Sequence, residues 1–169
     1  MEFDKVLEKR VSTRKFLDEK LSSLDIEKLI DAAKTSPIGH GAYDTVNITV
    51  ITNDEVIKAM SDEFKEKLNK QADPLFGAPC FIMVSSSKND TCEYEDCGCI
   101  IQTICLKATE MGLGSCYIRG LVHALGSSAN YIKSLNLPDG FRPISGLVVG
   151  KIDHELVGKS HDMKINYVE

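Results

Sequence analysis

The sequence has no long hydrophobic run. Its longest apolar stretches, residues 80–84 and 146–150, are far too short to span a bilayer. The first ten residues mix acidic and basic side chains and lack the apolar centre of a secretory signal. We therefore expect a cytoplasmic protein in which the six cysteines stay reduced.

The sequence also has fewer basic than acidic residues. The 20 Lys and Arg residues face 25 Asp and Glu residues, which gives a net charge of -5 and a pI near 5.4. Nucleic acids and anionic membranes both require a basic face on the protein that binds them. We therefore expect neither of these partners.

The signatures of hydrolytic and metal-dependent enzymes are missing as well. The chain contains no Cys-x-x-Cys pair, no Gly-x-Ser-x-Gly elbow and no histidines at metal-ligand spacing. We therefore expect no metal site. The absence of these motifs favours chemistry carried by an organic cofactor.

The cysteines leave one alternative open. The spacing of Cys92, Cys97 and Cys99, followed by Cys105, is one residue short of a plant-type iron–sulfur motif. We expect Cys97, Cys99 and Cys105 to pack as small apolar side chains on one helix. An iron–sulfur or thiol redox protein that uses all four residues is the alternative hypothesis.

What the sequence does contain is the pattern of an α+β domain. Its length, and an apolar content of 43%, suit a single domain over residues 1–169 with its own core. Helical spacing predicts helices over 3–9, from a Ser22 or Ser23 cap toward Pro37, from an Asp54 cap to Leu68, from Asp96 to 111, and over 121–135. Alternating or short apolar runs predict strands over 46–52, 80–84, 115–118 and 144–149, with the tail beyond 151 as a candidate edge strand.

The most distinctive local pattern is the row Arg10, Ser12 and Arg14. The β-branched residues Val11 and Thr13 favour an extended backbone, in which residues two apart point the same way. Such a row spans roughly 13 Å and suits a phosphate at one end and an electron-rich carbonyl at the other. A solvated basic turn is the alternative interpretation.

Six short segments then follow one another in a characteristic order. They are Arg10-x-Ser12-x-Arg14-x-Phe16, Ser36-Pro37-Ile38-Gly39 after a helix, Ala78-Pro79, Met111-Gly112-Leu113-Gly114-Ser115-Cys116, Leu137-Pro138-Asp139-Gly140 and Val148-Val149-Gly150. Together they resemble the nitroreductase family of FMN-dependent oxidoreductases over nearly the whole chain. The resemblance implies a homodimer with a three-layer α/β/α fold and a mixed, mainly antiparallel sheet.

The resemblance also implies where FMN binds. Arg10, Val11 and Ser12 would hold the phosphate and ribityl chain, and Arg14 would lie at the N1/O2 edge, where a cation raises the reduction potential. The segment that would reach the flavin of the other subunit is Pro37, Ile38 and Gly39. The segment that would pass the N5 side is Tyr117, Ile118, Arg119 and Gly120. The C-terminal residues that would bind phosphate are Lys159 and His161.

The implied activity needs no catalytic side chain. Hydride would pass from NAD(P)H through flavin N5 to a nitroaromatic, a quinone or a similar acceptor, and Arg14 and Arg119 would tune the electrostatics. The Asn and Gln-Pro-Trp usual in the family are replaced by Gly41 and residues 42–45. A non-catalytic flavin-binding or flavin-handling protein on the same fold is therefore an alternative.

Overall fold

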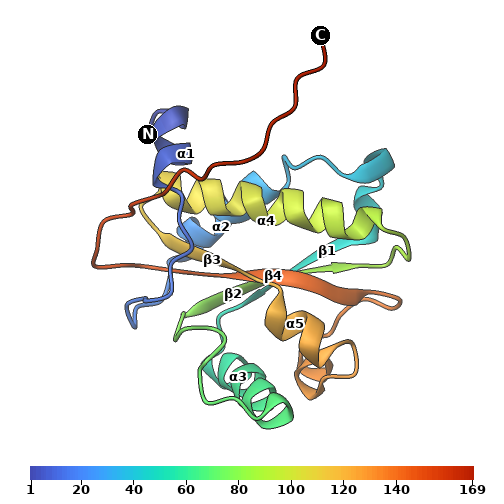
Figure 1. Cartoon of the computed structure of the whole chain (residues 1–169). Coiled ribbons are helices and arrows are strands. Elements are labelled where there is room, and N and C mark those ends of the chain that lie inside the picture. Colours follow the sequence, from blue (N-terminus) through green and yellow to red (C-terminus); the bar gives the residue numbers. More distant parts are fainter.

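A four-stranded sheet lies between two layers of helices in the computed structural model, which describes residues 1–169 (Figure 1). The strands are β1 (Val46–Ile51), β2 (Cys80–Ser86), β3 (Gly114–Ile118) and β4 (Arg142–Gly150), in the order β1-β2-β4-β3 with antiparallel neighbours throughout. One face carries α2 (Ser23–Ala33) and α4 (Cys92–Glu110), and the other carries α3 (Asp54–Leu68) and α5 (Gly120–Leu125). Helix α1 (Phe3–Lys9) packs on α4, and short 3₁₀ turns cover Gly39–Gly41, Tyr43–Thr45 and Asn130–Ser134. The predicted α+β class and three-layer arrangement are confirmed.

The alternation of side chains along β2 divides the interior into two cores. Cys80, Ile82 and Val84 belong to the cluster beneath α2 and α4, whereas Phe81 and Met83 belong to the cluster above α3 and α5. Every residue of β2 is buried, as a continuous apolar run in a central strand requires. Facing β2, Gly146 of β4 leaves room for the Phe81 ring, since a Cβ there would overlap the ring carbon Cζ.

Capping side chains define where helices α2 and α3 begin. Ser22 caps α2 by accepting a hydrogen bond from the backbone N–H of Asp25, and the Asp25 carboxylate accepts one in return from the N–H of Ser22. Helix α3 is capped by Asn53, whose side chain accepts from two backbone N–H groups, and not by Asp54 as the sequence predicted. Asp54 is instead the first helical residue, where the positive end of the helix dipole stabilises a carboxylate.

Three other expectations about elements were wrong. Helix α4 begins at Cys92, earlier than the predicted Asp96, because residues 92–95 add one further turn. The helix predicted over 121–135 ends at Gly126, which adopts a left-handed φ of 66°, and only a 3₁₀ turn follows. The tail forms no strand. The open edge of β3 is already taken by Ser12, which forms a parallel bridge to Ser115.

No helix in the structure combines the length and the apolar character that crossing a bilayer requires.

Candidate functional site

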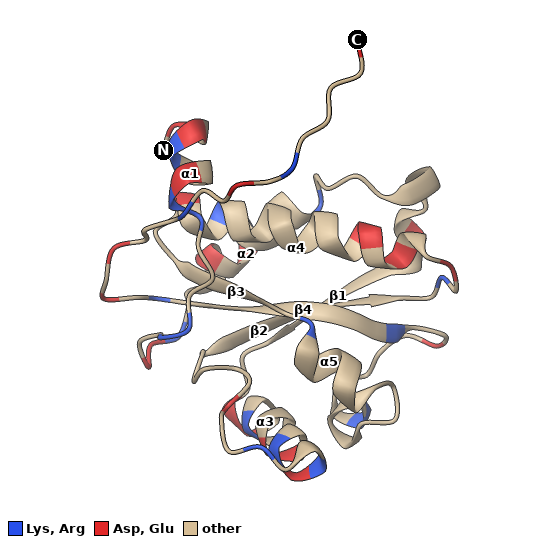
Figure 2. Ribbon diagram, in the orientation of Figure 1, with Lys and Arg blue, Asp and Glu red and all other residues tan.

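The basic row runs beside β3. The backbone N–H of Thr13 donates to the carbonyl of Ser115 at 2.8 Å, so the chain is extended here, as predicted. Thr13 is buried against Gly114, where a Cβ would come within 2.7 Å of the Thr13 methyl group. Because side chains alternate in an extended chain, Ser12 and Arg14 lie on the opposite side of this segment from Thr13. Figure 2 shows basic residues along this segment, next to a sheet that carries almost no charge.

Three of the four arginines make no ion pair. Arg142 is paired with the buried carboxylate of Glu93, whereas Arg10, Arg14 and Arg119 have no carboxylate within reach. Arg14 contacts the carbonyl of Ser12 at 3.5 Å and lies over the ring of Phe76, 5.8 Å from its centroid. In a chain with an excess of acids, these free guanidinium groups are available to bind an anion.

The C-terminal segment returns to this row. A Cβ at Gly158 would overlap the carbonyl oxygen of Glu8 and lie 3.2 Å from that of Arg10, so only glycine permits the contact. Lys159 follows directly and makes no ion pair, which brings a further free cation beside the Arg10 segment. His161 lies farther along the exposed tail and contacts no charged group, and the tail leaves the body beyond α1 (Figure 1).

Residues 117–120, at the end of β3, line a cavity of about 340 Å³. Phe64, Lys70 and Phe76 line its opposite side. Ile118 is only 6% exposed and belongs to the cluster above α3 and α5. Arg119 lines the cavity, and Arg14 lies over the ring of Phe76, which is another of the lining residues.

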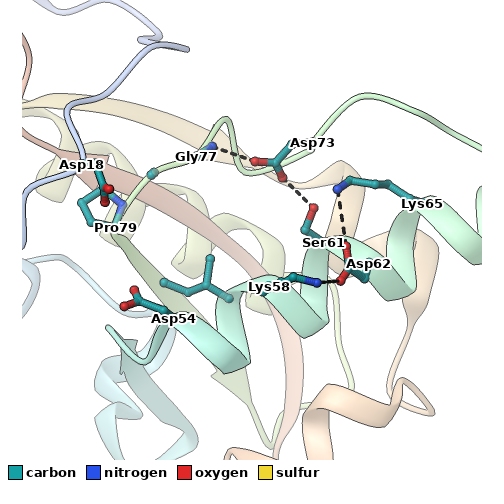
Figure 3. A pocket seen from close by; sticks show the side chains of 11 residues that line it. Asp18, Asp54, Lys58, Ser61, Asp62, Lys65, Asp73, Gly77 and Pro79 are labelled. Carbon is teal, nitrogen blue, oxygen red and sulfur yellow. Dashed lines mark hydrogen bonds and ion pairs between the residues drawn. The ribbon is translucent and has the colours of Figure 1, made fainter.

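Asp73 shapes the loop that carries Phe76. Its carboxylate accepts from the Ser61 hydroxyl and from the backbone N–H of Gly77, both at 2.7 Å (Figure 3). It also accepts from the backbone N–H of Leu75 at 3.0 Å. Burial acts to raise the pKa of Asp73, but these donors outweigh it and hold the pKa below its usual value. The turn places Phe76 at a φ of 57°, a left-handed conformation that costs a non-glycine residue about 1 kcal/mol.

Sequence analysis did not single out Asp73 or Phe76. An available signal was the Asp73-Pro74 pair followed by Gly77, since Asp before Pro starts turns and glycine tolerates positive φ.

The cavity drawn in Figure 3 lies on the other side of this loop and is less suited to a phosphate. It measures about 380 Å³, and four carboxylates line it against the two ammonium groups of Lys58 and Lys65. Both lysines already contact Asp62, at 2.5 and 3.5 Å. The remaining field is negative, so it repels anionic ligands.

The loop at residues 37–39 is held by Lys88 and by Asp96, near the start of α4. The backbone N–H of Gly39 donates to Asp96 at 2.7 Å, and Lys88 donates to the same carboxylate at 2.7 Å and to the Gly39 carbonyl at 3.2 Å. The Lys88 and Asp96 side chains are 9% and 8% exposed. Burial acts to raise the pKa of Asp96, but the Lys88 and Gly39 donors hold the pKa below its usual value. Ile38 itself is buried in the cluster beneath α2 and α4.

This loop and the basic row do not meet within one chain. Asp96 holds the loop near the start of α4, whereas the Met1 amino group lies 3.8 Å from Glu110 at its end. At 1.5 Å per residue, about 20 Å of helix separates the two contacts. Pro37, Ile38 and Gly39 therefore lie apart from Arg10, Ser12 and Arg14 in the same subunit.

The cysteines are dispersed. Cys97 and Cys105 are buried in the cluster beneath α2 and α4, as predicted, and burial raises the pKa of Cys97 to about 12. Cys99 is exposed, contrary to expectation, because it lies on the outer face of α4. No group of three or more His, Cys, Asp or Glu side chains is arranged to hold a metal ion. The structure gives the iron–sulfur hypothesis no support.

Comparison with known proteins gives a consistent result. The model of the nitroreductase family matches residues 7–151. A structure of a nitroreductase with bound FMN from Desulfitobacterium hafniense is 26% identical, with a TM-score of 0.88 over 100% of this chain and 99% of that one. Two others share the fold: a nitroreductase with bound FMN from Bacteroides fragilis (21% identity, TM-score 0.85, 100% of both chains) and an FMN-dependent nitroreductase from Clostridium difficile (23%, 0.83, 99% of both). No curated protein matches the sequence.

Proposed function

Because the chain belongs to the nitroreductase family, we propose that it is a homodimeric FMN-dependent oxidoreductase, with residues 1–169 forming one FMN-binding domain. The reaction is the transfer of hydride from NAD(P)H to a nitroaromatic, a quinone or a similar acceptor. The observation that carries the proposal is the unpaired basic row, Arg10, Ser12 and Arg14, with Lys159 beside it.

The donor set matches the chemistry of FMN. A phosphate dianion accepts several charge-assisted hydrogen bonds, and Arg10, Ser12 and Lys159 supply donors. The nearby carboxylates of Glu155 and Asp153 pair with other lysines. Val11 contributes backbone next to them. When bound, FMN supplies the acceptance and donation of hydride at N5. The chain needs to provide binding and orientation, and it needs no general base.

The other residues orient and tune the reaction centre. Arg14 is the cation for the N1/O2 edge, and its stacking on Phe76 limits its freedom to move into solvent. Tyr117 and Ile118 carry the backbone past the cofactor, and the backbone N–H groups of Arg119 and Gly120 are the donors for the N5/O4 side. His161 assists at the phosphate when the tail folds toward the row.

A second copy completes the site in this proposal. Residues 37–39 lie too far from the basic row to serve the same cofactor in one subunit, so they serve the partner's. The tail also exposes Met163, Tyr167 and Val168 to 80%, 80% and 91%, and Phe3 of α1 is 64% exposed. Apolar side chains gathered in this way favour burial against another chain.

An anaerobic titration tests the proposed activity. The purified protein should be yellow, lose its flavin absorbance on addition of NADH or NADPH, and regain it with a nitroaromatic or a quinone. Arg14→Gln should lower the flavin reduction potential by roughly 30 mV, which equals about 1.4 kcal/mol for two electrons. The control Lys133→Gln removes an exposed, unpaired cation far from the row and should leave the potential unchanged.

Two outcomes would contradict the proposal in different ways. Protein that does not take up FMN would refute flavin binding altogether. Protein that holds FMN but oxidises neither NADH nor NADPH would favour the non-catalytic alternative. That alternative is based on the lack of amide side chains at Gly41 and residues 42–45.

A further inference from the structure

A buried ion pair holds both backbone groups of a single loop residue. The Asp96 carboxylate accepts from the N–H of Gly39 at 2.7 Å, and the Lys88 ammonium donates to the carbonyl of Gly39 at 3.2 Å. The side chains of Lys88 and Asp96 lie 2.7 Å apart and are 9% and 8% exposed. Gly39 is therefore fixed by two charges that solvent hardly reaches.

Lys88 is itself held at its backbone. Its N–H donates to the Ser86 hydroxyl at 3.0 Å, and its carbonyl accepts from the guanidinium of Arg142 at 2.8 Å. Ser86 ends β2 and Arg142 begins β4, so the two central strands of the sheet set the position of Lys88. Through Lys88 and Asp96, the loop is tied to the sheet and to α4 at the same time.

The loop at residues 37–41 is strained, and its tip faces outward. His40 and Gly41 adopt φ values of 61° and 66°, and a left-handed backbone costs a non-glycine residue about 1 kcal/mol. Pro37, His40 and Gly41 are all exposed. A buried ion pair adds little net stability, because the desolvation of both charges offsets their attraction, and one role of such pairs is to specify a single geometry. A strained conformation fixed in this way on an exposed loop indicates that the conformation itself has a function.

We propose that Asp96 is a positioning residue for the FMN site of the partner subunit. Together with Lys88, it fixes the loop at residues 37–41 in the conformation that completes that site. The inference rests on the proposed function, in which residues 37–39 serve the partner's cofactor. About 20 Å of helix separates Asp96 from the end of α4 that lies near the amino terminus, so Asp96 acts on the cofactor of the other subunit and not on that of its own.

Equilibrium dialysis of the FMN-loaded dimer at pH 7 tests the positioning role. In Asp96→Asn the loop is held by fewer contacts, so part of the binding free energy goes into ordering it, and the affinity for FMN should fall about tenfold. The double variant Lys88→Met with Asp96→Asn buries no unpaired charge. It should therefore regain stability in urea but not regain affinity for FMN, a combination that a purely structural role does not produce.

Glu93→Gln is the matched control. Glu93 lies one turn before Asp96 on α4, its side chain is 3% exposed, and its carboxylate pairs with Arg142 and makes no hydrogen bond to the loop. This variant also weakens a buried ion pair and should lower the free energy of unfolding. It should keep the wild-type affinity for FMN.

A mixed dimer identifies the subunit on which Asp96 acts. When one subunit carries Asp96→Asn and the other carries Arg10→Ala, one site contains both substitutions and the other contains neither. The mixed dimer, isolated by means of two different affinity tags, should therefore bind one FMN with wild-type affinity. If Asp96 acted within its own subunit, each site would contain one substitution, and neither site would retain that affinity.

Each contrary result has a distinct meaning. Unchanged affinity for FMN in Asp96→Asn, or an equal loss in Glu93→Gln, would overturn the positioning role and leave the proposed function standing. A mixed dimer without a wild-type site would overturn the action across the interface. Wild-type protein that takes up no FMN would refute the proposed function itself.

Discussion

Replacing Asp96 by asparagine removes the negative charge that Lys88 contacts inside the protein. The new amide would keep one oxygen for the Gly39 N–H, so the change isolates the ion pair from the backbone contact. Breaking a buried pair by removing one partner costs about 3–5 kcal/mol, because the other charge stays buried and unpaired. We expect a loss of unfolding free energy at or below the lower end of that range, since Lys88 also donates to the Gly39 carbonyl.

A double-mutant cycle separates this pair from its surroundings. Lys88→Met combined with Asp96→Asn removes both charges, so the double variant should be more stable than Asp96→Asn alone. Urea denaturation at pH 7 with saturating FMN measures all four proteins. A double variant as unstable as the single one would refute the reasoning, because it would mean that no unpaired charge was being rescued.

The pH dependence of the same pair has a definite sign. The pKa of Asp96 is lowered in the folded protein from the usual 3.8, so its stabilisation is complete above that value and is lost as the pH falls through the folded pKa. The stability difference between the wild type and Asp96→Asn should therefore be constant from about pH 5 upward and shrink below pH 3.8. A difference that persists undiminished at lower pH would contradict the assignment.

Three further predictions concern packing, the loop and assembly. Gly146→Ala should destabilise by about 2–3 kcal/mol in urea, because a Cβ would overlap a buried ring and lie 2.8 Å from a backbone carbonyl, whereas Gly98→Ala, with no atom within 4 Å, should stabilise by about 0.5–1 kcal/mol. Asp73→Ala should cost about 2–3 kcal/mol through three orphaned donors, and the control Asp62→Ala, whose ion pairs are exposed, should change the urea midpoint far less. Deletion of residues 159–169 should convert a dimer into a monomer in analytical ultracentrifugation, and an unchanged dimer would refute the role of the tail.

Short-range patterns explain why much of the fold was predictable. Alternation along β2 and the capping residue Ser22 depend on neighbours in sequence, and the structure follows them closely. The end of helix α5 at Gly126 was harder to predict, because a glycine is tolerated within helices as well as at their ends. The tail misled for a different reason: its alternation suits a strand, but the tail leaves the body beyond α1 and does not run along an edge strand (Figure 1).

The candidate site divides in the same way. The extended row at Arg10–Arg14 could be predicted because β-branched neighbours act locally. The contact of Gly158 with the Glu8 carbonyl and the stacking of Arg14 on Phe76 join segments far apart in the chain, and no spacing in the sequence encodes them. The ion pair between Lys88 and Asp96 likewise depends on a turn that brings the loop before α4 back over its first residues.

The central claim is that the basic row and Lys159 bind a phosphate. The most direct test compares the affinities of the protein for FMN and for riboflavin. Riboflavin lacks only that phosphate, and losing two charge-assisted contacts should weaken binding by at least about 100-fold. Arg10→Ala should weaken FMN binding while leaving riboflavin binding unchanged. Equal affinities for the two flavins, or equal effects of Arg10→Ala on both, would contradict the account.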